Sequence, residues 1–138
     1  MIFVDTGAIY ALIDKNDTHH TAARDFYSMH TGSGAFHVSY PVITETCMLL
    51  EIRLGNYYAR KFWQSLLDEV FKIIPLQISE LERALYIEYH YADACFGFVD
   101  ATSMALIESG KIQKIFTFDR KHFLIFKPSV SKGIELLP

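Results

Sequence analysis

Short apolar runs alternate along this chain with longer segments whose apolar residues recur at helical spacing. The first run, at residues 2–4, is continuous and apolar, which is typical of a buried parallel strand. Further strand-like runs lie at residues 35–39, 70–75, 115–118 and 133–137. Helical spacing covers residues 8–13, 18–29, 41–54, 57–69, 79–91 and 100–109. This alternation predicts an α/β fold whose parallel sheet of about four to five strands is flanked by helices on both faces.

Proline, glycine and polar residues mark where these elements begin and end. Asp17 or Thr18 is placed to cap the second helix, and Pro41 suits the first turn of the third. Gly55 ends that helix, and the polar residues around His122 predict a turn after the fourth strand. In parallel sheets of this kind, ligands collect outside the carboxyl ends of the strands. Residues that directly follow the strands are therefore the first candidates for a site.

The length of 138 residues and the 51% hydrophobic composition suit one compact core, and no linker or repeat divides the chain. The amino terminus lacks a basic segment followed by a long apolar stretch, and no window approaches the roughly 20 apolar residues that span a bilayer. We therefore expect one soluble domain over residues 1–138, in the cytoplasm and without a membrane partner. Cys47 and Cys95 form no CxxC pair and are interpreted as reduced thiols in or near the core.

The net charge of −3 argues against a protein whose whole surface binds nucleic acid electrostatically. Two local basic clusters remain, one of Arg53, Arg60 and Lys61 and one of Arg120 with Lys121. Either cluster would suit phosphate contacts beside an acidic centre, and either would equally suit a solvated helix face.

Four acids stand where strands end or helices begin. Asp5 follows the first strand, Asp119 follows the fourth, Asp100 opens a helix, and Glu45 lies early in another. Taken singly, the last three have structural alternatives as a turn residue, a helix N-terminal acid and an exposed helix acid. Carboxylates that gather within a few ångström raise each other's pKa and destabilise the fold unless protons or cations intervene. If all four acids lie close together, the cluster therefore indicates a functional site.

A hard divalent cation is the simplest partner for such a cluster. Mg²⁺ and Mn²⁺ prefer oxygen ligands, and four carboxylates suffice for one or two ions. Two ions about 4 Å apart would activate water and stabilise the departing oxygen during in-line displacement at phosphorus. This chemistry is that of a nuclease or a phosphatase.

The ordered motifs resemble those of the PIN-domain ribonucleases over essentially the whole chain. They are Val4-Asp5-Thr6, Thr44-Glu45, the stretch at residues 98–103, and Thr117-Phe118-Asp119 followed by His122-Phe123. The resemblance is closest to the single-domain VapC-type toxins of prokaryotic toxin–antitoxin pairs. It implies a metal-dependent endoribonuclease that uses Mg²⁺ or Mn²⁺.

The resemblance also implies residue roles. Asp5 and Asp100 would be the principal metal ligands, Asp119 would complete that site or bind a second ion, and Glu45 would hold metal or position the attacking water. The supporting residues that it implies are Thr6 and Thr117, through their hydroxyls, and Asp93, where some family members place an additional acid. Asp93 is alternatively a turn residue or a helix cap.

The partners implied by the resemblance are an RNA substrate, a cognate antitoxin protein and a second copy of the chain. The helices over residues 41–70 are the candidate surface for the antitoxin and for the homodimer. An aromatic residue of the antitoxin would pack on these helices while an arginine reaches the carboxylates. Tyr57, Tyr58, Phe62 and Trp63 in this region suit either core packing or an interface.

Other functions fit the residues less well. A receiver-type phosphoacceptor needs an acidic pair where Asp5 stands alone, and a haloacid-dehalogenase-like phosphatase needs an acid where Gly7 stands. The six histidines lack zinc-site spacing and are interpreted as surface or capping residues. Two alternatives stay open: a PIN-like RNA-processing nuclease outside a toxin system, and a PIN-like module that binds RNA or protein without cleaving it.

Overall fold

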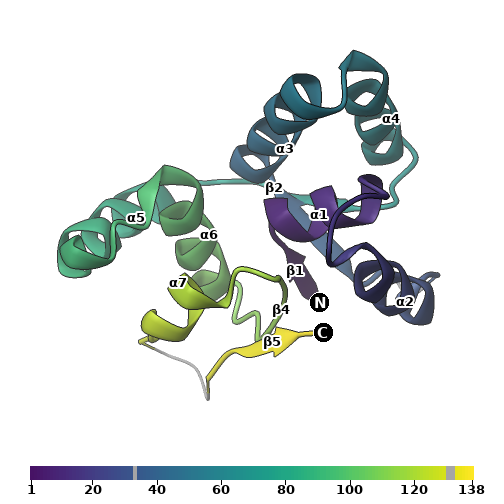
Figure 1. The fold of residues 1–138 in the computed structure, drawn as a ribbon. Helices are drawn as coiled ribbons and strands as arrows, with labels where there is room; N and C mark the ends of the chain where they lie inside the picture. Colours follow the sequence, from purple (N-terminus) through teal and green to yellow (C-terminus); the bar gives the residue numbers. More distant parts are fainter. Residues whose placement is uncertain (33, 130–132) are drawn as a thin grey trace.

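The computed structural model describes residues 1–32, 34–129 and 133–138, and within them a five-stranded parallel sheet forms the centre of an α/β fold (Figure 1). The strands are β1 (Ile2–Val4), β2 (Phe36–Ser39), β3 (Lys72–Ile74), β4 (Lys114–Phe116) and β5 (Glu135–Leu137). Their order in the sheet is β3-β2-β1-β4-β5, and every pair is parallel. The central strand β1 is therefore paired on both edges, and all three of its residues are buried on the two faces of the sheet, which explains why they form one continuous apolar run.

Helices cover both faces of this sheet, as the alternation of elements predicted. They are α1 (Thr6–Ile13), α2 (His20–His30), α3 (Tyr40–Arg53), α4 (Asn56–Leu67), α5 (Ile78–His90), α6 (Gly97–Ser109) and α7 (Arg120–Ile125). Figure 1 shows α1 and α2 on one side of the strands and α5, α6 and α7 on the other. The helix α3 contacts both α1 and α6, so it joins the two sides.

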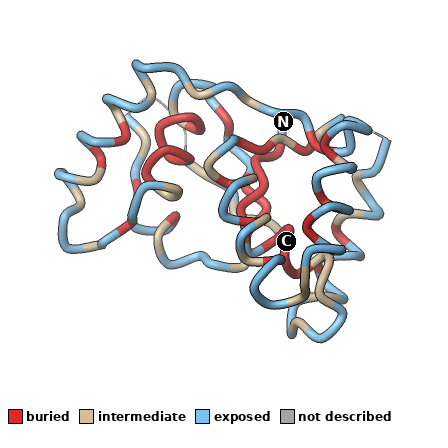
Figure 2. The backbone as a smooth tube through the Cα atoms, turned by 90° about the horizontal axis from the view of Figure 1, so that it is seen from above, coloured by how far each residue is buried: buried red, intermediate tan, exposed pale blue. Residues whose placement is uncertain are grey.

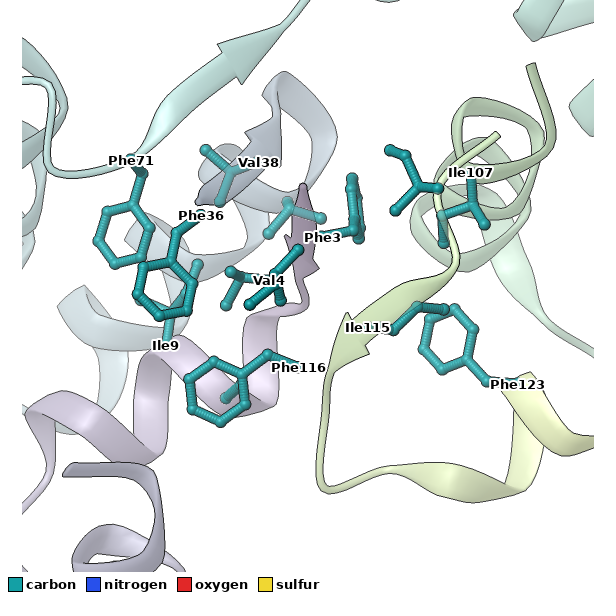
Figure 3. Close-up of a cluster of buried hydrophobic side chains, with 14 of the residues drawn as sticks. Phe3, Val4, Ile9, Phe36, Val38, Phe71, Ile107, Ile115, Phe116 and Phe123 are labelled. Carbon is teal, nitrogen blue, oxygen red and sulfur yellow. The ribbon is translucent and has the colours of Figure 1, made fainter. Parts of the chain in front are cut away.

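The core lies on both faces of the sheet because successive strand residues point to opposite sides. Figure 3 shows Phe36, Phe71 and Phe116 on the side of α1, whereas Ile107 and Ile115 lie on the opposite side. Figure 2 shows buried segments running through the middle of the molecule, and β1 and most residues of β4 and α6 are buried. Burial of these strands fixes the positions of the residues at their carboxyl ends.

Two local predictions were wrong. The polar stretch around His122 forms the short helix α7 rather than a turn, because Phe123 and the following Phe126 are both buried and hold it against the core. The second helix begins at His20 with His19 as its N-cap, one residue after the predicted cap Thr18 and two after Asp17, because the Asp17 side chain accepts the backbone N–H of His19 and keeps that segment in a turn.

The two cysteines differ in their surroundings. Both are free, and Cys47 is half-buried as expected for a thiol near the core. Cys95 is exposed, so its predicted place in the core is wrong. It adopts a left-handed backbone conformation with φ of 52° immediately after a 3-10 turn at Ala92–Ala94. Along the part of the chain that the structure describes, no helix has the length and apolar character needed to cross a bilayer.

Candidate functional site

Asp5 lies at the carboxyl end of the central strand β1, where it also caps helix α1. Its Oδ1 accepts the backbone N–H of Ala8 at 2.9 Å, and its own N–H donates to the carbonyl of Phe116 at 3.2 Å. Strands on both sides of β1 leave Asp5 only 9% exposed. The fold thus places a carboxylate in a largely dry position at the centre of the sheet edge.

Thr117 joins Asp5 to the neighbouring strand end. It directly follows β4 and is fully buried, and its hydroxyl donates a hydrogen bond to Oδ2 of Asp5. The same hydroxyl accepts the backbone N–H of Asp119 at 3.1 Å. The hydrogen bond predicted from Thr117 to the acids is therefore present, and it brings the turn that carries Asp119 beside β1.

Burial and like charges together raise the pKa of Asp5 to about 7 from the usual 3.8. Burial is the largest cause, and the negative charges of Asp100 and Asp119 add to it. The hydrogen bonds from Thr117 and Ala8 favour the charged form and lower the pKa in part. Without a cation, Asp5 therefore holds its proton to a much higher pH than an ordinary aspartate does.

Asp100 lies in the first turn of α6, where the following residues are buried and fix its backbone. Its Oδ2 is 2.5 Å from Nδ1 of His122 on α7, and both side chains are partly exposed. Burial raises the pKa of Asp100, the hydrogen bond and charge of His122 oppose this, and the charges of Asp119 and Glu45 raise it further. His122 is thus a site residue that the sequence interpretation missed when it treated all histidines as surface or capping groups.

The electrostatic couplings link all four predicted acids. Asp100 and Asp119 both act on Asp5, while Asp119 and Glu45 both act on Asp100. Glu45 enters through α3, which packs against α1 and α6, the helices that begin beside Asp5 and Asp100. Four elements far apart in the sequence therefore carry acids that sense one another's charge at one edge of the sheet.

The two remaining predicted residues behave differently from Thr117. The hydroxyl of Thr6 is buried and has no hydrogen-bond partner within the described residues, so the bond expected from it to the acids is not formed. Asp93 is exposed in the 3-10 turn, and the charges that act on Asp5 and Asp100 come from other acids. The structure does not bring Asp93 into the cluster.

The donor set suits a hard divalent cation in its chemistry. In residues 1–32, 34–129 and 133–138, no three His, Cys, Asp or Glu side chains are arranged as a complete set of metal ligands. Oxygens of Asp5 and Asp100 instead accept hydrogen bonds from Thr117 and His122. A cation would offset both the burial that is the main cause of the two raised pKa values and the repulsion that adds to it, and its bound waters are the kind of partner that the orphaned Thr6 hydroxyl lacks.

The basic clusters take separate places. The guanidinium of Arg53 lies 5.3 Å from the centre of the Tyr10 ring, and the ammonium of Lys61 lies 5.5 Å from the centre of the Tyr57 ring. Arg120 donates to the carbonyl of Pro138 at 2.5 Å, which ties α7 to the carboxyl terminus. Lys121 is exposed in the first turn of α7, two residues after Asp119.

An apolar surface along α3 holds two adjoining pockets, and one of the four acids, Glu45, lines the second. One part of it, about 600 Å³, lies between α3 and α4, and a second part of about 740 Å³ lies between α3 and the start of α6 and includes Glu45. Both parts share the same wall on α3, formed by Tyr40, Thr44 and Met48. Trp63 at one end and Phe98 at the other are 63% and 60% exposed. We call this surface the α3 groove.

Comparisons with known proteins agree with this architecture. The family model described as PIN domain matches residues 2–125. Ribonuclease VapC26 of Mycobacterium tuberculosis (strain ATCC 25618 / H37Rv) is 26% identical over 137 residues, which are 99% of this chain and 100% of that protein.

Two solved structures share the fold. The crystal structure of VapC20 from M. tuberculosis, a sarcin–ricin loop cleaving toxin, has a TM-score of 0.81 and 27% identity, covering 88% of this chain and 92% of that chain. The crystal structure of DNA-bound VapBC from Salmonella typhimurium has a TM-score of 0.67 and 14% identity, covering 99% of this chain and 97% of that chain. The second likeness concerns the fold alone.

Proposed function

This chain belongs to the PIN-domain family, and from that premise we propose that it is a metal-dependent endoribonuclease, the toxin of a type II toxin–antitoxin pair. The observation that carries the proposal is the coupled cluster of acids at the sheet edge, with Asp5 buried and its pKa raised to about 7. The similarity to VapC26, whose name is that of a ribonuclease, supports the same activity.

Each acid has a part in this proposal. Asp5 is the fixed ligand, because the cap of α1 and the Thr117 hydroxyl hold it at the sheet edge. Asp100 is the second ligand, presented by the first turn of α6. Asp119 is exposed and makes no capping bond to α7, so its side chain is free to turn toward an ion. Glu45 lines the neighbouring groove and is placed to orient water at the edge of the cluster.

Bound Mg²⁺ or Mn²⁺ would supply Lewis acidity to the phosphodiester and make a nearby water a better nucleophile at neutral pH. The chain's own residues bind and orient: the acids hold the charge balance, and Lys121 meets the RNA backbone beside them. The proposed products carry 5′-phosphate and 3′-hydroxyl ends, because water and not the ribose hydroxyl attacks phosphorus. Single-stranded or looped RNA is the proposed substrate class, since unstacked nucleotides bring a phosphate into reach of a recessed carboxylate.

The test is cleavage of end-labelled RNAs by the purified protein in Mg²⁺, Mn²⁺ or EDTA. The RNAs include unstructured oligomers, stem-loops and a sarcin–ricin loop oligomer, the target in the name of the structurally similar VapC20. We expect metal-dependent cleavage that is lost in Asp5→Asn and Asp100→Asn and kept in Asp25→Asn, which removes an exposed acid of α2. Cleavage in EDTA, or cyclic phosphate ends, would contradict the proposed chemistry.

The proposed antitoxin site is the α3 groove. Its walls are apolar, its exposed Trp63 offers a stacking partner, and its far end reaches Glu45, so a peptide with an aromatic residue followed by arginine would match both ends. The measurement is inhibition of RNA cleavage by the purified antitoxin, with wild type and Trp63→Ala compared. Weaker inhibition of the variant with unchanged basal cleavage supports the groove, and equal inhibition refutes it.

The proposed homodimer uses the outer faces of α3 and α4. Exposed apolar residues outside the α3 groove lie on these helices, among them Ile52 and Tyr57. Sedimentation equilibrium of wild type and Ile52→Asp tests the assignment, with a dimer expected for the first and a monomer for the second. A protein that binds RNA without cleaving it in any of the metal conditions would instead favour the non-catalytic module.

A further inference from the structure

The contact between His122 and Asp100 joins two helices directly at the acidic cluster. Nδ1 of His122 lies 2.5 Å from Oδ2 of Asp100, which is a short and direct hydrogen bond. Both the neutral Nδ1–H tautomer and the imidazolium donate through this nitrogen, so the bond exists in either form. The histidine therefore fixes one oxygen of Asp100 from the side of α7.

The position of His122 is itself fixed by packing. Its ring meets the buried ring of Phe96 edge to face, with 5.2 Å between centroids and an interplanar angle of 72°. The neighbouring Phe123 is buried in the core. The carbonyl of His122 accepts the N–H of Phe126, which is also buried. A short helix with two buried phenylalanines thus holds the imidazole against the carboxylate.

The orientation of Asp100 matters because its backbone does not determine where its oxygens point. A carboxylate at a helix N-terminus rotates about two side-chain torsions, and its terminal torsion is broad. The hydrogen bond from His122 removes that freedom and occupies Oδ2, so that Oδ1 is the oxygen presented to a cation. A ligand held in one orientation loses less conformational entropy when an ion binds.

We propose that His122 is a positioning residue that orients Asp100 and thereby strengthens the binding of a divalent cation to the acidic cluster. The inference rests on the proposed function, in which Asp100 is a metal ligand. It adds a residue to the site and predicts a difference between substitutions that keep the donor and substitutions that lose it.

The experiment measures Mn²⁺ binding to RNA-free protein by calorimetry. In His122→Asn the amide nitrogen takes nearly the place of Nδ1 and keeps the donor beside Asp100, whereas His122→Gln moves it one bond farther and His122→Leu removes it. We expect Asn to bind Mn²⁺ within about threefold of wild type, and Gln and Leu to bind it about 10- to 100-fold more weakly, the usual cost of losing a group that orients a metal ligand. His90→Leu is the matched control, since His90 also packs against aromatic rings, those of Tyr86 and Tyr91.

The outcomes separate this inference from the proposed function. Circular dichroism in EDTA checks that each variant folds, and if Leu does not fold, the two neutral amides Asn and Gln carry the test. Equal Mn²⁺ affinity in wild type, His122→Asn and His122→Gln overturns the positioning role while leaving the metal site intact. The positioning role is also overturned if His122→Asn loses as much Mn²⁺ affinity as His122→Gln. Absence of Mn²⁺ binding in the wild type and in Asp100→Asn alike overturns the metal site, and this inference with it.

Discussion

Replacing Asp5 by asparagine is expected to stabilise the metal-free protein at neutral and alkaline pH. The carboxylate is buried beside two other acids, so its charged form is costly in the folded state. The amide is neutral and nearly isosteric, and its oxygen still accepts the N–H of Ala8 that caps α1. The substitution removes the charge and keeps the cap.

The size of this effect follows from the pKa shift of Asp5. The folded-state pKa is about 7 and the ordinary value is 3.8. At about 1.4 kcal/mol per pKa unit, the charged form costs roughly 4 kcal/mol more in the folded than in the unfolded chain. In the variant, the amide nitrogen makes a weaker hydrogen bond with the Thr117 hydroxyl than the protonated carboxyl group of Asp5 does. We therefore expect the unfolding free energy to rise by a net amount of about 2 to 4 kcal/mol above pH 7.

The sign of the pH dependence is fixed by the same shift. Between pH 3.8 and about 7 the folded wild type holds a proton on Asp5 that the unfolded chain has released. The unfolding free energy of the wild type therefore falls across this window as the pH rises, and this contribution is level above it. The variant lacks this contribution, so the stability difference between the two proteins grows from pH 4 to pH 7 and then stays constant.

The assay is urea unfolding in EDTA at several pH values from 4 to 9. Subtracting wild type from Asp5→Asn removes the contributions of the titrating groups that do not interact with Asp5, whereas Asp100 and Asp119, which act on Asp5, still contribute to the difference. A difference that is flat with pH, or a variant that becomes less stable than wild type above pH 7, would refute the assignment of Asp5 as a buried, repelled acid. Addition of Mn²⁺ is expected to raise the stability of the wild type more than that of the variant.

Three further predictions concern Thr117, Lys121 and Asp93. Thr117→Val removes the hydroxyl that lowers the pKa of Asp5. In the same urea experiment, the pH at which the stability of the metal-free protein levels off should therefore move above about 7. A shift to lower pH would contradict the hydrogen bond from Thr117 to Asp5. Lys121→Ala should weaken binding of uncleaved RNA in EDTA alike for all sequences and reduce the slope of log affinity against log salt by about 1, measured by fluorescence anisotropy. Asp93→Asn should leave RNA cleavage unchanged, because this acid is exposed in a turn and does not act on Asp5 or Asp100; loss of cleavage would show that it joins the site when RNA or metal binds.

The sheet and its helices were predictable because strong local patterns and global topology agree. Residues 2–4 and 115–116 are apolar without interruption since both strands are buried on two faces, and this is the signal that a parallel sheet leaves in a sequence. Helix α7 escaped prediction for the opposite reason. Its six residues are too few for a periodic pattern, and only the tertiary burial of Phe123 makes the segment helical.

The sequence predicted that the four acids would gather at one edge of the sheet, and it predicted their hydrogen-bond partners less well. A carboxylate at the end of a buried strand is visible in the sequence, because the chain direction in a parallel sheet fixes where strand ends meet. The hydrogen bond of His122 depends on how α7 packs against α6, two elements joined by a strand and a turn. The one signal for it was the position of His122 three residues after Asp119, within one helical turn, and that spacing carries meaning only once the helix is known.

At position 5 the fold needs a hydrogen-bond acceptor that caps α1, but it does not need a negative charge. Its capping bond to Ala8 stabilises α1, yet asparagine or serine would supply the same acceptor without a buried charge. The charge costs roughly 4 kcal/mol when no cation is present, a large fraction of the 5 to 15 kcal/mol by which most domains are stable. Neither capping nor packing accounts for a carboxylate here, because both are met by a neutral residue. The proposed function explains the negative charge at Asp5, because a divalent cation would offset it, and the same reasoning extends to Asp100, whose pKa is raised by burial and by its acidic neighbours despite the hydrogen bond from His122.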